Sequence, residues 1–192
     1  SPIAIQLGRL DDAQEYLEES LILSTQIHDR WGMGTALGRM GNLALLKVDV
    51  QTAQRLLEKS LALFTDIGAR WDIAWALTQL GKAAIASGKW GEAEDLLKRA
   101  LRLSLEVQAL PQALDSALEL AQCFFQRGEF EQAAALVWSV INHPASADST
   151  RQRAGQLLEN IQTQGGAEVL EMGKQRQAVS GGTEAFLMRF AK

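Results

Sequence analysis

The residues of this chain that could carry out chemistry are few and scattered. The two histidines, His28 and His143, are far apart in the sequence and have no cysteine or carboxylate at metal-ligand spacing beside them. The single cysteine, Cys123, adjoins Phe124 in an apolar segment, which favours a buried, inert thiol over a nucleophile. We therefore predict no catalytic residue, no metal site and no cofactor, and we do not expect an enzyme.

The glycine-rich run at residues 32–41 invites comparison with phosphate-binding loops. Its spacing fits neither GxGxxG nor GxxxxGK[ST], and no strand pattern precedes it. Asp11-Asp12 and Glu18-Glu19 are paired carboxylates, but adjacent residues of a helix point in different directions. The glycines therefore indicate close packing, and the carboxylates indicate a solvated surface.

Composition excludes several classes of partner. The 192 residues are 47% hydrophobic and 22% charged, with a net charge of -4 and no stripe of lysine and arginine, so we expect no direct binding to nucleic acid. The apolar runs are far shorter than the roughly 20 residues of a membrane-spanning helix, so we expect no membrane association. A single cysteine excludes an internal disulfide and suits a cytoplasmic protein.

The elements that would position any site recur with a regular period. One small residue and one bulky residue four positions later repeat in register: Ala13, Ala53, Ala93 and Ala133, followed by Leu17, Leu57, Leu97 and Val137. A period of about 40 residues is typical of a solenoid, in which each unit buries its apolar face against its neighbours.

Each repeat has the pattern of a helical hairpin, with apolar and small residues at i, i+3, i+4 and i+7. We predict no strands, and helices at residues 10–27, 30–46, 50–67, 70–87, 90–107, 110–127 and 130–142, with longer links between hairpins than within them. Gly88 and Gly128 are expected to close helices, and Asp29 and Pro111 to begin them. Residues 2–7 match the end of a helix that should stop before Gly8.

The repeat pattern stops after residue 144. We predict that residues 1–144 form the repeats, with full units at about 30–67, 70–107 and 110–142, and that residues 145–192 form a helical cap. Ser149 and Gln152 resemble a capping box that opens a helix to about residue 164, and further helices are expected near 167–178 and 184–191.

These residues resemble the tetratricopeptide repeat. The pattern of Leu77, Leu80-Gly81, Ala93, Leu97 and Ala100 recurs one unit earlier from Leu37, although the unit is longer than the usual repeat of about 34 residues. The resemblance implies an all-α, right-handed superhelical solenoid that binds proteins or peptides. The long units, with Trp31 and Trp71 just before their first helices, also resemble the C-terminal sensor arms of bacterial multidomain signal-transduction ATPases and transcriptional regulators.

A partner would then bind the concave side, which the first helix of each hairpin lines. The candidate residues on this side are Thr35, Arg39, Asn42, Trp75, Gln79, Lys82, Asp115, Glu119 and Gln122. Trp31 and Trp71 recur at one register position and indicate a structural role, whereas Trp75 does not repeat and is the better ligand candidate. Two alternatives stay open: a merely solvated stripe, and a receptor arm for a small metabolite or sugar.

The start of the chain predicts a further contact. It begins Ser1-Pro2 and enters the register late, so we expect a fragment of a larger bacterial regulator. Apolar residues there lack an upstream neighbour, and we expect that the chain can self-associate through this end; they are Ile3, Ile5, Leu17 and Leu21.

Overall fold

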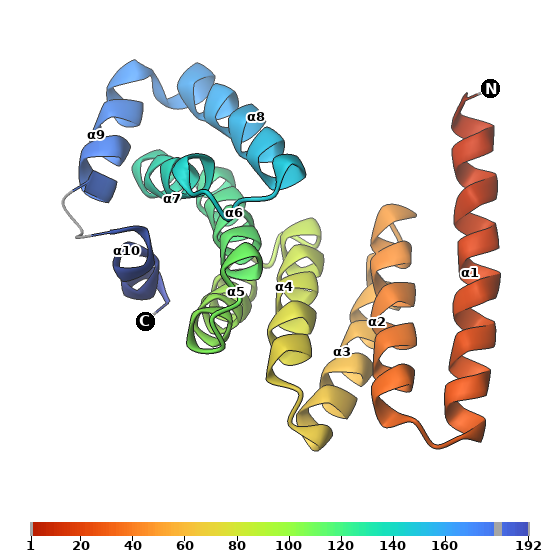
Figure 1. Ribbon diagram of the computed structural model, residues 1–192. Helices are drawn as coiled ribbons and strands as arrows, with labels where there is room; N and C mark the ends of the chain where they lie inside the picture. The colour runs from red at the N-terminus through yellow and green to blue at the C-terminus, as the bar shows by residue number, and fades with distance from the viewer. Residues whose placement is uncertain (1, 179–181, 192) are drawn as a thin grey trace.

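The chain is a row of antiparallel α-helices (Figure 1). The computed structural model describes residues 2–178 and 182–191, with side chains from residue 9 onward, and within these ranges it contains ten helices and no strand. The helices are α1 (Pro2–Gln26), α2 (Arg30–Leu46), α3 (Val50–Ile67), α4 (Arg70–Ala86), α5 (Trp90–Glu106), α6 (Leu110–Gln126), α7 (Phe130–Asn142), α8 (Asp148–Gly165), α9 (Ala167–Ala178) and α10 (Thr183–Phe190). No helix in the described ranges is both long and apolar enough to cross a membrane.

One turn, repeated at a constant interval, ends each helix from α1 to α6. Its central residue has a left-handed backbone with φ between 56° and 78°, at His28, Val48, Gly68, Gly88, Gln108 and Gly128. The amide of the next residue donates to the carbonyl five residues before it, at 2.8–2.9 Å, from Asp29 to Ser24 through Glu129 to Phe124. This closure satisfies carbonyl groups that a helix end leaves free.

The turn confirms some expected boundaries and corrects others. Asp29 caps α2 by accepting from the amide of Gly32 at 3.0 Å, and Pro111 lies in the first turn of α6. The longer links predicted between hairpins are wrong, because the same turn serves within and between them. The capping box at Ser149 is also wrong: α8 begins at Asp148, and Arg151 donates to the carbonyl of Ser146 instead.

The first helix is longer than expected. α1 begins at Pro2 and runs through Gly8 without a break, so the helix end predicted before Gly8 is wrong. At the equivalent positions 48, 88 and 128, a complete first helix precedes the turn, and the second helix folds back on it. At Gly8 the chain makes no such turn, and α1 continues as one helix.

Within a hairpin, glycine lets the two helices approach closely. A Cβ atom on Gly41 of α2 would lie 2.7 Å from Leu57 Cγ of α3, and one on Gly81 of α4 would lie 2.6 Å from Leu97 of α5. The buried Ser60 hydroxyl donates to the carbonyl of Gly34 across the same contact, at 2.7 Å. The repeated small residues predicted from the sequence therefore lie where helices meet.

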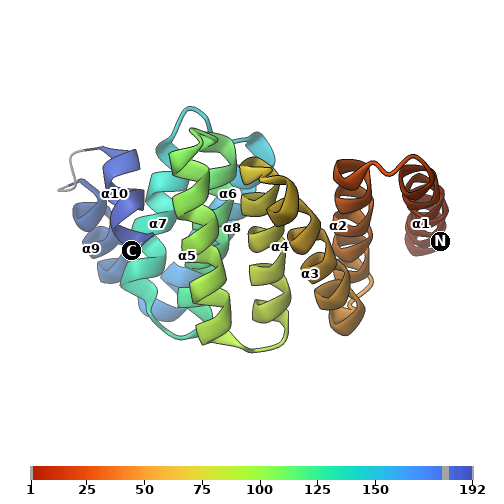
Figure 2. The same ribbon diagram turned by 90° about the horizontal axis from the view of Figure 1, so that it is seen from below.

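The row of helices is curved, with one helix of each hairpin on its inner side. α2 contacts α4, α4 contacts α6 and α6 contacts α8, whereas the second helices α3, α5 and α7 are held further apart. The first helices therefore line the inner side, as expected. At one edge α1 packs mainly on α2, and it stands apart in Figure 2.

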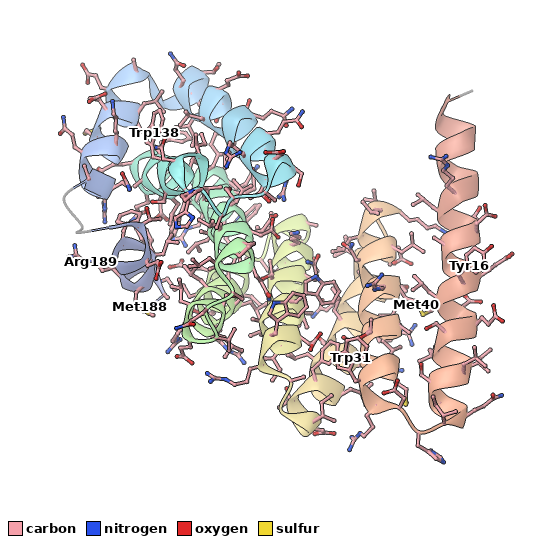
Figure 3. The ribbon with its side chains drawn as sticks, viewed as in Figure 1. Tyr16, Trp31, Met40, Trp138, Met188 and Arg189 are labelled. Atoms are coloured by element: carbon pink, nitrogen blue, oxygen red, sulfur yellow. The ribbon has the colours of Figure 1, made fainter. Side chains whose placement is uncertain are left out.

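The C-terminal end departs from the hairpin pattern. α9 packs mainly along α7 rather than on α8, with Gly173 against Ala134, and the Trp138 indole donates to the carbonyl of Leu170 at 3.2 Å (Figure 3). α10 buries Phe186 and Leu187 where it contacts α5 and α7. These helices cover the last repeat, and the boundary at residue 144 stays a prediction.

We predict that glycine is the more stabilising residue at the left-handed position of the turn, so that opposite substitutions at Val48 and Gly88 change stability in opposite directions. Val48 is β-branched, 80% exposed and left-handed at φ 62°, so Val48→Gly should raise the free energy of unfolding by about 1 kcal/mol. Gly88 has φ 69° at the same register position, so Gly88→Val should lower it by about 1–2 kcal/mol. Urea denaturation of both variants measures the two changes, and a destabilised Val48→Gly protein would contradict the assignment.

Candidate functional site

A hollow on the inner side has aromatic residues as half of its lining. This tryptophan pocket lies between α2 and α4 and has a volume of about 310 Å³. Its lining residues are Trp31, Thr35, Arg39, Asn42, Phe64, Trp71, Asp72 and Trp75. Four of the nine residues predicted to bind a partner are therefore brought together here: Thr35, Arg39, Asn42 and Trp75.

The Trp75 ring fits into the pocket because the facing helix, α2, has a glycine at the contact. A Cβ atom on Gly38 of α2 would lie 2.6 Å from the indole of Trp75, so only a residue without a side chain leaves room for this ring. Trp71 lies one helical turn before Trp75, and residues at i and i+4 share a helix face. α4 thus presents two indoles towards α2.

Polar groups stand at the edge of the pocket. The Trp31 indole donates to the Asp72 carboxylate at 3.2 Å, which links α2 to α4. Arg39 is exposed, and among the described side chains no carboxylate forms an ion pair with it. Trp31 and Trp71 are 52% and 53% exposed, so large aromatic surfaces remain open to a partner.

Three other predicted residues form an ion-pair network with a residue from the cap. Lys82 lies 3.4 Å from the Glu119 carboxylate and 3.5 Å from that of Asp115. Arg153 of α8 binds the same two carboxylates, with 3.1 Å to Asp115. Because two cations face two anions, this part of the inner side offers no excess charge to a partner.

The last two predicted residues lie outside the pocket. Gln79 is buried, at 5% exposure, as is Glu119. Gln122 borders a smaller cavity of about 170 Å³ beneath α8. The nine residues therefore do not form one continuous stripe, because burial and the contact with α8 divide them.

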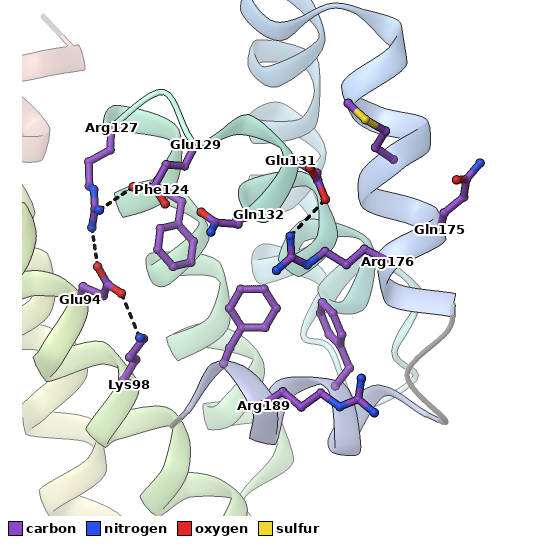
Figure 4. Close-up of a pocket in the computed structure, with 13 residues that line it drawn as sticks. Glu94, Lys98, Phe124, Arg127, Glu129, Glu131, Gln132, Gln175, Arg176 and Arg189 are labelled. Carbon is purple, nitrogen blue, oxygen red and sulfur yellow. Dashed lines mark hydrogen bonds and ion pairs between the residues drawn. The ribbon is translucent and has the colours of Figure 1, made fainter.

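A larger cavity of about 840 Å³ lies on the other side of the molecule, beside α10 (Figure 4). Glu94 there pairs with Lys98 at 2.9 Å and with Arg127, which also contacts Glu129 at 2.6 Å. Burial opposes ionisation of Glu94, but hydrogen bonds from Lys98 and Arg127 outweigh it and lower the pKa of this carboxyl. Glu94, Lys98, Arg127 and Glu129 of this cavity are therefore already paired within the protein.

The residues considered first for chemistry do not assemble into a reactive site. No cluster of three or more His, Cys, Asp or Glu side chains suited to a metal is present in the described residues. His143 accepts a hydrogen bond from the backbone amide of Ala145 at 3.1 Å, which is a capping role. Cys123 is fully buried and donates to the carbonyl of Trp90 at 3.4 Å.

Comparison with known families identifies the repeats. Two family models, both described as tetratricopeptide repeat, match residues 32–106 and 78–147. The chain contains tetratricopeptide repeats. The matched ranges include every residue of the tryptophan pocket except Trp31 and every residue of the ion-pair network except Arg153.

Solved structures show the same fold. Two structures of the nearly identical TPR-like repeats of a putative kinesin light chain from Podosopora anserina are similar to this chain. The first has a TM-score of 0.64 and 21% sequence identity, and the match covers 90% of this chain and 89% of that structure's chain. The second has a TM-score of 0.63 and 21% sequence identity, and the match covers 92% of this chain and 90% of that structure's chain. No curated protein matched the chain.

Trp31 and Trp71, which were not among the predicted binding residues, also line the tryptophan pocket. Their structural role at the hairpin joints stays a prediction, and the hydrogen bond from the Trp31 indole to Asp72 agrees with it. The spacing of Trp71 and Trp75 at i and i+4 was the available signal, because it places both indoles on one face. Arg153 had no such signal, since its contacts join residues 34 and 38 positions apart.

We predict that Cys123 is unreactive in the folded protein. Burial raises the pKa of its thiol to about 11. At pH 8 roughly one thiol in a thousand is then ionised, and the thiolate is the reactive form. Labelling with a disulfide reagent at pH 8 should be at least about 100-fold slower in buffer than in urea. Equal rates in the two solvents would contradict the burial.

We also predict that Lys82 stabilises the fold. Lys82→Glu would place a third carboxylate beside Asp115 and the buried Glu119, and should lower the free energy of unfolding by about 1–2 kcal/mol. Lys59→Glu on the exposed side of α3 makes the same charge change as a control. Thermal melts of both variants measure the difference, and equal melting temperatures would show that the network contributes nothing.

Proposed function

We propose that this tetratricopeptide chain is a protein-interaction module that holds a segment of a partner protein in the tryptophan pocket. The observation that supports it is the group of three indoles around one hollow, two of them more than half exposed. Tryptophan is enriched among residues that dominate binding energy, because it combines a large apolar surface with a hydrogen-bond donor.

The chemistry of the pocket favours a peptide segment with a bulky apolar side chain. The indoles and Phe64 offer an apolar floor, while Arg39, Asn42 and Asp72 stand around it as donors and acceptors for backbone groups. Lys82, Asp115 and Glu119 are paired with one another and with Arg153, so this network carries no net charge that would attract a charged segment. Apolar burial would then drive affinity, with polar groups fixing direction.

The wider setting that we propose is a larger bacterial regulatory protein of the cytoplasm. The recurrence of Trp31 and Trp71 in the first turn of α2 and of α4 supports this resemblance, and both residues belong to the pocket. In such a protein, the pocket would couple partner binding to another domain, and we propose no catalytic step within this chain.

A peptide-selection experiment tests the site. Random peptides displayed on phage are selected against the whole chain, and the enriched peptides are titrated by fluorescence anisotropy. Trp71→Ala should weaken their binding by about 2 kcal/mol, roughly 30-fold, because an exposed anchor of the pocket is lost. Ile22→Ala, an equally exposed site on α1, should leave affinity unchanged.

Two results would overturn this function. Selected peptides that bind Trp71→Ala as tightly as the unmodified chain would place the binding surface elsewhere. A failure to enrich any peptide, together with a thermal shift from a metabolite or sugar, would favour the small-ligand alternative instead.

A further inference from the structure

The cavity beside α10 has an equivalent two repeats earlier in the chain. This earlier cavity lies between α1 and α3, over α2, and has a volume of about 300 Å³. Six of its lining residues stand two repeat periods before six lining residues of the cavity beside α10. The six pairs are Gln14 and Glu94, Glu18 and Lys98, Ala44 and Phe124, Lys47 and Arg127, Asp49 and Glu129, and Thr52 and Gln132. The two cavities are therefore one groove of the solenoid at two of its steps.

At the later step, a helix of the chain occupies part of this groove (Figure 4). α10 contacts both walls, α5 and α7, and buries Phe186 and Leu187 there. The Phe190 ring lies 5.0 Å from that of Phe186 and 6.1 Å from that of Phe124, which belongs to the floor helix α6. Such ring pairs are favourable beyond their burial. The occupant at this step is thus a short amphipathic helix with two aromatic residues one turn apart.

At the earlier step, the groove is open and has more room. Its lining comes entirely from α1, α2, α3 and the turn between α2 and α3, so both walls and the floor are present and no other described helix lies in it. Ala44 stands where Phe124 stands at the later step, so a ring that completes the floor there is missing here. Met40, Leu43 and Leu56 make the remaining surface apolar. We call this cavity between α1 and α3 the outer groove.

Most polar groups at the edge of the outer groove already have partners. Lys47 is paired with Asp11 at 2.7 Å and donates to Gln14 at 2.9 Å, and Asp49 accepts from the amide of Thr52 at 3.1 Å. Arg55 is exposed and forms no ion pair with a described side chain. The groove therefore offers an apolar floor and one cation, which could pair with a carboxylate of an incoming helix.

We propose that the outer groove is a docking site for a short amphipathic helix of a separate protein, with two aromatic residues one turn apart and a carboxylate near them. This helix would lie between α1 and α3 as α10 lies between α5 and α7. A second copy of the chain is disfavoured as the occupant, because its α10 is already buried in its own groove. The outer groove is on the opposite side of α2 from the tryptophan pocket, so either site can fail without the other.

The sequence of α10 supplies a probe of this chemistry. The probe is a labelled peptide of residues 182–191 with a hydrocarbon staple between positions 185 and 189, which are exposed on α10, and it keeps Glu184 as its carboxylate. The control peptide has the same staple and alanine in place of Phe186 and Phe190. In a fluorescence-anisotropy titration with the whole chain, the probe should bind at least about tenfold tighter than the control, because the two rings fill the groove.

Variants of the groove locate the binding. Met40→Arg should weaken the probe at least about tenfold, because it places a charge in the apolar floor, and Thr52→Arg on the α3 wall is a second variant with the same expected effect. Arg55→Glu should weaken it only about threefold, as expected for an exposed ion pair. Leu46→Arg introduces the same charge into α2 outside the groove, where the side chain is 64% exposed, and should leave affinity unchanged.

A photoreactive group on the probe distinguishes the two equivalent grooves. Cross-links to residues 40–56 would support the site. Cross-links to residues 120–132 would overturn it, because the probe would then be displacing α10 from its own groove. No binding, or equal binding to Met40→Arg, Thr52→Arg and Leu46→Arg, would also overturn it. A dimer in sedimentation that Met40→Arg disrupts would assign the outer groove to a second copy and contradict a separate partner.

Discussion

The structure depends on one backbone turn that recurs at a constant interval along the chain. Because each turn closes with the same left-handed residue and the same hydrogen bond, α2 to α6 are 17–18 residues long and antiparallel to their neighbours. Equal lengths keep every second helix in the same register. This is why side chains one period apart occupy equivalent places, and why first helices always lie side by side on the inner face.

Small differences at equivalent places decide where the inner face opens. Gly38 of α2 leaves room for the Trp75 ring, and the tryptophan pocket results. The residue equivalent to Gly38 in α4 is Thr78, whose hydroxyl lies 2.8 Å from that of Ser116 in α6, both buried. The residue equivalent to Trp75 in α6 is Asp115, which belongs to the ion-pair network. The same backbone thus gives a hollow in one step of the solenoid and a sealed contact in the next.

The sequence was sufficient for the features that the repeat period controls. The number and type of the repeated helices, their inner face and the contacts of Gly41 and Gly81 all follow from residues that recur in register. Features that depend on one residue at one place were less predictable. The left-handed Val48 has an unusual residue type for its conformation, and Arg153 meets Asp115 and Glu119 only because α8 folds back across α6.

The two ends of the solenoid are finished differently. At the C-terminal end, α8 and α9 pack on α7, and α10 adds Phe186 and Leu187 to the core, so the last repeat is covered. At the other end, α1 packs mainly on α2 and leaves Tyr16 and Leu23 exposed, although the same positions on α3 and α5 are more shielded. Repeat proteins gain stability from each interface between neighbours, so the exposed side chains of α1 are apolar surface that no described helix covers, whereas α8, α9 and α10 supply such an interface for α7.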